Sequence, residues 1–315
     1  MSSVGGGAEA AIQEVQTNAK LQTLNTNRST RYASHRAAHS NIVIQNWDPD
    51  FALRSPMFEP LRWAAAELNA RDWPSLKDLQ RLVAARAEPI LTAGGAPLRF
   101  VAQGARPRRM EDRYEARIYL HGEVQVRDAN WHDLLNVLVW LTFPRAKVAL
   151  NARHYLALLA QEKSGVRDRG PVQDALTLFD EGGVIVAASD IELLRHVECF
   201  AWKRLFWRER TRVTRAMRFF LFGHALYEKA LAPFTGITGR SILIHVAADL
   251  PAAPLPIQIE ALDRMVSARL GDPGWLRSPS NLAPLPILGV PGWCAQNESA
   301  GYYDDATYFR PGRGR

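Results

Sequence analysis

Residues 130–155 read NWHDLLNVLVWLTFPRAKVALNARHY, a largely apolar stretch with one proline near its centre. Apolar residues dominate its first half until Phe143-Pro144 interrupts them, and proline disfavours a helical conformation for the residue before it. The stretch therefore predicts two helices, over about 130–142 and 145–162, that turn at Pro144 and pack as an antiparallel pair. Asp128 or Asn130 is expected to cap the first helix.

Polar side chains interrupt both of these apolar helices. They are His132, Asp133, Asn136, Asn151 and His154. Because burying such a group without a hydrogen bond costs about 1–3 kcal/mol, the five are expected either to pair internally or to hold a ligand. The helix dipole gives Asp133 a structural explanation, whereas His132 has none and is a candidate functional residue.

A third element adds two further candidates. A helix is predicted over about 212–231, and its residues His224 and Glu228 share a face with apolar side chains, so both are expected to point inward. A buried carboxylate has a raised pKa unless a nearby cation or metal ion compensates its charge. Either His224 and Glu228 bond to each other within the helix, or they act in metal ligation or general acid–base catalysis.

Histidines and carboxylates together can ligate zinc, iron or manganese. The predicted ligands of such a divalent metal are His132, His154, His224 and Glu228, and the predicted catalytic residues are His132, Asp133, Asn136, Asn151, His154 and Glu228. The acidic pairs Asp180-Glu181 and Asp304-Asp305 are more simply turn residues, with hard-cation binding as the alternative.

The net charge of +7 is concentrated in one segment. Residues 195–218 hold eight basic and two acidic side chains. On a single helix, Arg204, Arg208, Arg212 and Arg215 would form one stripe suited to phosphates or to an acidic partner. A solvated helix face is the other interpretation of such a run.

The remaining patterns predict an α+β fold, a mainly helical single domain with short β-hairpins and a Pro/Gly-rich C-terminal segment. Residues 1–45 are expected to be a disordered tail and 46–313 the globular domain. The expected helices are at 57–70, 75–86 and 256–270. Strands are expected at 98–103 and at 114–127, with a hairpin turn at His121-Gly122, and two more strands at 175–189 around a turn at 180–183. A buried strand is expected at 241–246 and an extended segment at 284–293.

Composition and missing motifs exclude several classes of protein. No apolar run is long enough to span a membrane and the first residues lack a secretory signal, so we expect a cytoplasmic protein without membrane insertion. The two cysteines, Cys199 and Cys294, support neither a zinc knuckle nor a disulfide framework. Dinucleotide-binding, P-loop, zincin and α/β-hydrolase motifs are absent from the sequence.

Several segments together resemble the bacterial domain-of-unknown-function family numbered 3025. They are 130–155, 174–183, 219–239, 284–293 and 302–312, the last reading YYDDATYFRPG. The resemblance covers about residues 45–313 and implies a single-domain proteobacterial cytoplasmic protein. It implies no activity, cofactor or catalytic residue.

Two functions from different classes fit these patterns. The first is a metal-assisted hydrolase or phosphoesterase that acts on an anionic substrate in a polar His/Asp/Glu pocket between apolar helices. The second is a non-enzymatic protein that binds a nucleic acid or an acidic partner through the basic helix 195–218. The concentration of polar residues on apolar helices favours the enzyme, whose partner would be an anionic small molecule.

Overall fold

The helix pair around Pro144 is present in the computed structural model, which describes residues 46–68, 71–165 and 169–312. Helix α5 spans Trp131–Thr142 and α6 spans Pro144–Ser164, with Pro144 as the first residue of α6. The Asn130 side chain caps α5 by accepting a hydrogen bond of 3.0 Å from the backbone N–H of Asp133. This part of the prediction is confirmed, whereas the tail predicted for 1–45 lies outside the described residues.

The domain is mainly helical, as predicted, and its strands form two small sheets rather than isolated hairpins. Besides α5 and α6, the α-helices are α2 Arg62–Ala65, α3 Leu76–Ala84, α4 Tyr114–His121, α7 Pro171–Gly182, α8 Ile191–Glu198, α9 Arg210–Ala216, α10 His224–Ala230 and α11 Leu255–Gly271. The strands are β1 Arg99–Ala102, β2 Glu123–Val126, β3 Gly183–Ala188, β4 Met217–Leu221, β5 Thr238–His245 and β6 Ala283–Pro286.

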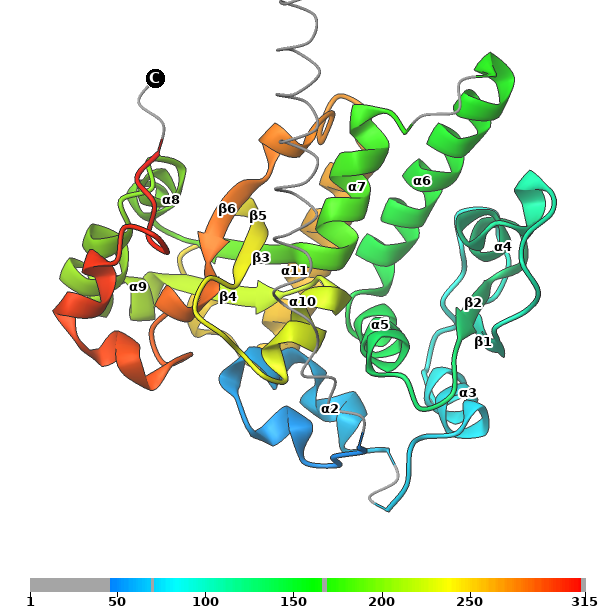
Figure 1. The fold of residues 1–315 in the computed structure, drawn as a ribbon, viewed down its shortest axis with the longest axis horizontal. Coiled ribbons are helices and arrows are strands. Elements are labelled where there is room, and N and C mark those ends of the chain that lie inside the picture. The colour runs from blue at the N-terminus through cyan, green and yellow to red at the C-terminus, as the bar shows by residue number, and fades with distance from the viewer. Residues whose placement is uncertain (1–45, 69–70, 166–168, 313–315) are drawn as a thin grey trace, which may run out of the picture. The chain divides into compact units, whose positions relative to one another are not determined.

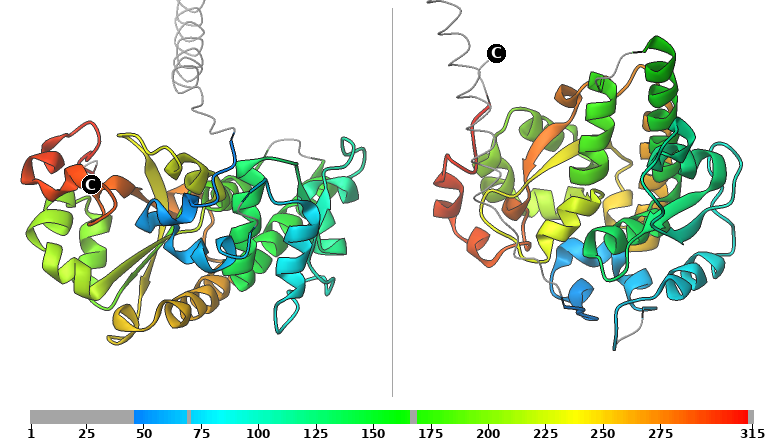
Figure 2. Two further views of the ribbon diagram at one scale, coloured as in Figure 1. Left: turned by 90° about the horizontal axis from the view of Figure 1, so that it is seen from below. Right: turned by 45° about the vertical axis from the view of Figure 1, so that its right-hand side comes forward.

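The larger sheet has the strand order β4-β3-β5-β6. Its central strand β3 is buried along its whole length, and it runs parallel to β5 and antiparallel to β4. Helix α7 packs against β3 and β5, and α10 packs against α5. The small parallel sheet β1-β2 lies with α3 and α4 on the other side of α5 and α6 (Figures 1 and 2). The pair α5 and α6 therefore lies between the two sheets.

The hairpin predicted within 98–127 is wrong. Residues 114–121 form helix α4, whose Ala116, Tyr119 and Leu120 recur at helical spacing and pack against Tyr155 of α6. Gly122, expected as a hairpin turn, instead ends α4 in the left-handed conformation with φ 69°. Because a helix separates them, β1 and β2 pair in parallel.

The hairpin predicted at 175–189 is also wrong, because only its second half is a strand. Pro171 starts helix α7, which continues to Gly182, and β3 follows directly. Gly183 is required there by close packing, since a Cβ on it would lie 2.3 Å from the carbonyl oxygen of Phe179. The acidic pair Asp180-Glu181 therefore lies in the last turn of a helix.

The segment 195–231 is broken where long helices were predicted. Helix α8 ends before Phe200, which has a φ of 58°, and a π-helix at Arg204–Arg208 leads into the short helix α9. The aromatic run after it forms strand β4 against β3, because aromatic residues fit a half-buried sheet edge. The predicted helix over 212–231 is thus α9, β4 and α10 in sequence.

Residues 241–246 and 256–270 match the predictions for β5 and α11 closely. The segment predicted as extended over 284–293 is in part strand β6. Within the described residues, no helix combines the length and the apolar character needed to cross a membrane.

Candidate active site

Two histidines from different helices meet where α10 packs against α5. His132 lies in the first turn of α5 and His224 is the first residue of α10. Their Nε2 atoms are 3.0 Å apart, and their rings are nearly perpendicular, at 84°. Glu228, one turn further along α10, places Oε2 2.9 Å from Nδ1 of His132. Both ring nitrogens of His132 are therefore engaged.

Glycine allows α10 to begin so close to the end of α7. A Cβ on Gly223 would lie 2.3 Å from the carbonyl oxygen of Glu181 and 2.4 Å from the backbone nitrogen of Gly183. Only a residue without a side chain fits such a contact. This close approach brings His224 next to Asp180, whose Oδ2 is 3.8 Å from Nδ1 of His224.

A buried polar chain continues beyond Asp180. Lys147 of α6 is buried, and its Nζ lies 2.5 Å from Oδ1 of Asp180 and 2.9 Å from Oδ1 of Asn136. Asn136 in turn donates to the Tyr114 hydroxyl over 2.8 Å. The two histidines thus stand at one end of a polar network within an apolar core.

The two histidines have opposite electrostatic environments. The hydrogen bond to Glu228 raises the pKa of His132 above its ordinary value, and burial lowers the pKa of His224 to about 4. The His132 side chain is 33% exposed and that of His224 8%. Burial alone would raise the pKa of Asp180, but Lys147 and His224 together lower it below the usual value for an aspartate. Near neutral pH, His224 is neutral and Asp180 is ionised.

A cavity of about 610 Å³ opens beside these groups. Its lining includes His132, Asn136, Asp180 and His224, together with His154 of α6. The structure thus brings His132, His154 and His224 to one cavity, and Glu228 joins them through its bond to His132.

The other predicted residues serve internal contacts. Asp133 lines the cavity, but both of its oxygens accept hydrogen bonds of 2.8 Å from the Arg127 guanidinium. Asn151 donates to the backbone oxygen of Glu115 over 3.0 Å and to its carboxylate over 2.7 Å. Glu228 bonds to His132, so the alternative of an internal His224–Glu228 bond is not what the structure shows.

The metal site has no support in the part of the chain that the structure describes. No group of three or more His, Cys, Asp or Glu side chains there could hold a metal ion. The carboxylates beside the histidine pair explain this result, because Glu228 and Asp180 face the two Nδ1 atoms while the Nε2 atoms face each other. At 3.0 Å, the two Nε2 atoms are within hydrogen-bond distance of each other.

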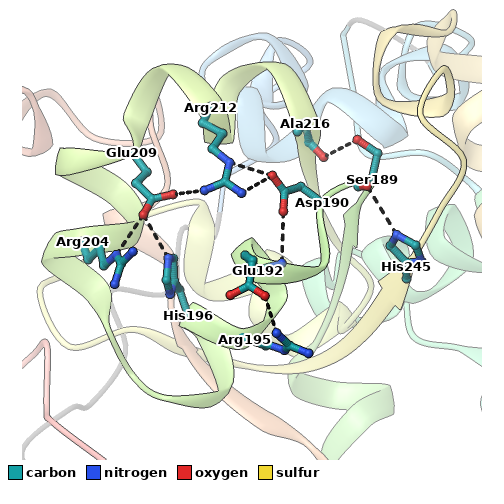
Figure 3. Close-up of polar contacts among 10 residues, drawn as sticks. All are labelled: Ser189, Asp190, Glu192, Arg195, His196, Arg204, Glu209, Arg212, Ala216 and His245. Atoms are coloured by element: carbon teal, nitrogen blue, oxygen red, sulfur yellow. Dashed lines mark hydrogen bonds and ion pairs between the residues drawn. The ribbon is translucent and has the colours of Figure 1, made fainter.

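The arginine stripe is not present, because its residues belong to two short helices. Glu209 accepts hydrogen bonds from Arg204, Arg212 and His196, and Arg212 also pairs with Asp190 (Figure 3). The hydrogen bond from Arg204 is the main cause that lowers the pKa of Glu209 to about 2. Of the predicted anion ligands Arg204, Arg208, Arg212 and Arg215, none lines the cavity. Arg204 and Arg212, two of the four predicted anion ligands, are thus paired with carboxylates of the protein itself.

Lys147 and Tyr114 are not among the residues predicted for the site, and Asp180 was predicted as a turn residue. A signal for Lys147 was available, because Lys147, Asn151 and His154 follow at i, i+4 and i+7 on one face of α6. A lysine on that buried face needs a carboxylate, and Asp180 on the neighbouring helix α7 supplies it.

Neither a comparison with curated proteins nor one with solved structures gives a match. A family model described as "Protein of unknown function (DUF3025)" matches residues 98–313, which is more than half of the chain. The match includes every residue of the polar network from Tyr114 to Glu228, and the chain belongs to this family.

Proposed function

We propose that this protein is a hydrolase that cleaves an ester or phosphoester of an anionic substrate by general acid–base catalysis. His132 is the general acid and His224 the general base. The observation that carries the proposal is the meeting of their Nε2 atoms at 3.0 Å, beside a cavity and in opposite electrostatic environments.

The roles follow from the surroundings of each ring. A pair of titratable groups whose environments push their pKa values apart is the usual arrangement of a catalytic acid and base. Glu228 favours the imidazolium form of His132, which can then donate a proton. Burial keeps His224 neutral, so its Nε2 can accept a proton.

In the proposed reaction, His224 takes a proton from the attacking water while His132 gives its Nε2 proton to the leaving oxygen. Water adds across the bond, and the two histidines have then exchanged protonation states. Because their Nε2 atoms lie within hydrogen-bond distance, the proton can return directly from His224 to His132. Asp180 stabilises the transient His224 imidazolium from the Nδ1 side.

This proposal keeps the hydrolase and phosphoesterase predictions but gives the activation of water to His224. A metal-assisted reaction would need ligands that the described residues do not bring together. Binding of a nucleic acid or acidic partner stays a prediction, and it no longer has the continuous arginine stripe as its basis.

A panel of p-nitrophenyl carboxylate esters, phosphomonoesters and phosphodiesters tests the proposal. We expect His132→Ala and His224→Ala each to lower kcat by about 10²–10⁴-fold, the usual contribution of general acid–base catalysis. His245→Ala is the matched control, because His245 is exposed and does not line the cavity. If the folded His132 and His224 variants hydrolyse a panel substrate at the wild-type rate, the assignment fails.

The pH–rate profile provides a second test. The proposed roles predict a bell-shaped profile whose acidic limb reports His224, with a pKa of about 4, and whose basic limb reports His132. Glu228→Gln removes the carboxylate that raises the pKa of His132, so the basic limb should shift to lower pH. The metal content of the untagged protein, measured by mass spectrometry, should show no stoichiometric metal. A bound metal lost in both histidine variants would favour the metal-assisted reaction instead.

A further inference from the structure

The cavity beside the histidine pair is lined by charges of both signs. Its carboxylates are Asp112, Glu115, Asp133, Asp180 and Glu181, and its guanidinium groups belong to Arg113, Arg127 and Arg169. Whether the cavity attracts an anion or a cation therefore depends on which of these charges are already satisfied by partners within the protein.

Four of the five carboxylates have internal partners. Asp180 is paired with Lys147, Asp133 with Arg127 and Glu115 with Asn151. Asp112 accepts hydrogen bonds from the backbone N–H groups of Arg108 and Arg109, at 3.3 and 3.0 Å. Glu181 is the one lining carboxylate that has no hydrogen bond or ion pair within the described residues.

The arginines show the opposite pattern. Arg127 is bound by Asp133 through two hydrogen bonds, but the guanidinium groups of Arg113 and Arg169 have no partner among the described residues. Arg113 stands just before α4 and Arg169 just before α7, so two separate elements contribute an exposed arginine to the lining of the cavity. The unsatisfied lining charges are thus two positive and one negative.

We propose that Arg113 and Arg169 form the subsite that binds the oxyanion end of the substrate, a carboxylate or a phosphate. The inference rests on the proposed function for the identity of the cavity as a substrate site. Guanidinium groups suit this role, because their donors match two oxygens of a carboxylate or phosphate at once. The subsite replaces the arginine stripe of 204–215 as the element that selects an anionic substrate.

Binding without turnover tests the subsite independently of catalysis. Inorganic phosphate and acetate are titrated separately into the full chain at low ionic strength, and binding is followed by calorimetry. We expect saturable binding of at least one of them, and about tenfold weaker binding for Arg113→Gln and for Arg169→Gln. Phosphate binding alone identifies a phosphate end group, and acetate binding alone a carboxylate.

Arg208→Gln and Arg215→Gln are the matched controls, because neither arginine lines the cavity. Equal binding by the wild type and the Arg113 and Arg169 variants, or no saturable binding of either anion by the wild type, would overturn the proposal. His132→Ala should still bind the anion. If the histidine variants keep hydrolysis while the arginine variants lose anion binding, the proposed reaction fails and the subsite stands.

Discussion

Lys147→Met tests whether the buried pair between Lys147 and Asp180 holds the polar network together. Lys147 is 3% exposed, and Met replaces its stem while removing the charge within 2.5 Å of Asp180. At an effective dielectric constant of about 20, this separation corresponds to an attraction of about 7 kcal/mol, part of which offsets the desolvation of both ions. Without Lys147, Asp180 must either stay charged and buried or take up a proton.

Protonation sets an upper limit on the cost of the substitution. An Asp that ionises at about pH 3.9 in the unfolded chain but stays protonated in the fold costs about 1.4 kcal/mol per pH unit above that value. The destabilisation from this source should be about 4 kcal/mol near pH 7 and only about 1.5 kcal/mol near pH 5. In the wild type the pKa of Asp180 is lowered, so its contribution to stability is retained at both pH values and is lost only at more acidic pH.

Guanidinium chloride unfolding followed by tryptophan fluorescence measures this difference at both pH values. The double variant Lys147→Met/Asp180→Asn is the control, because it leaves no charge behind and should recover most of the lost stability. Equal destabilisation by Lys147→Met at the two pH values would show that the buried charge of Asp180 is not the cause, as would a double variant less stable than the single one.

Three further substitutions are predicted from the same structure. Because the fold keeps His224 neutral, the stability of the wild type should fall by about 3 kcal/mol as the pH falls from about 6.5 to 4. His224→Phe should remove this pH dependence, which thermal unfolding over the same range measures. Burial raises the pKa of Asp263 to about 6, so the stability of the wild type should fall by about 3 kcal/mol as the pH rises from about 4 to 6. Asp263→Asn should remove this fall in the same unfolding series. Gly223→Ala places a Cβ 2.3 Å from the backbone of Glu181 and should lower the stability by about 1–3 kcal/mol, whereas Gly271→Ala, with open space around it, is the control.

The helices around Pro144 could be predicted because local signals agree there. Asn130 caps α5, apolar residues continue to Phe143, and proline is favoured in the first turn of the next helix. The hairpins could not be predicted in the same way. The apolar residues of 114–122 alternate as in a strand but also fit the spacing of a helix. The segment is a helix in the structure, where Ala116 and Tyr119 pack against Tyr155 of α6.

Part of the candidate site could be expected from the sequence, but the contacts between its residues could not. His132, His224 and Glu228 stand out because polar residues are unusual on apolar helices, and the structure places them together. The sequence does not show that Glu228 bonds to His132, 96 residues away, rather than to a neighbour on its own helix. That choice depends on the packing of α10 against α5, which brings residues far apart in the sequence into contact.

The opposite electrostatic environments of the two histidines arise from tertiary structure alone. As free side chains, both histidines would titrate near pH 6.5, and nothing would make one a better proton donor or acceptor than the other. Burial beside Lys147 disfavours charge on His224, while a half-exposed carboxylate favours charge on His132. The direct contact between their Nε2 atoms then couples the two rings, so a change at Asp180 or Glu228 should alter the titration of both histidines. In the proposed acid–base reaction, this coupling would restore the starting protonation state after each turnover, whereas a reaction on one ring alone would not need it.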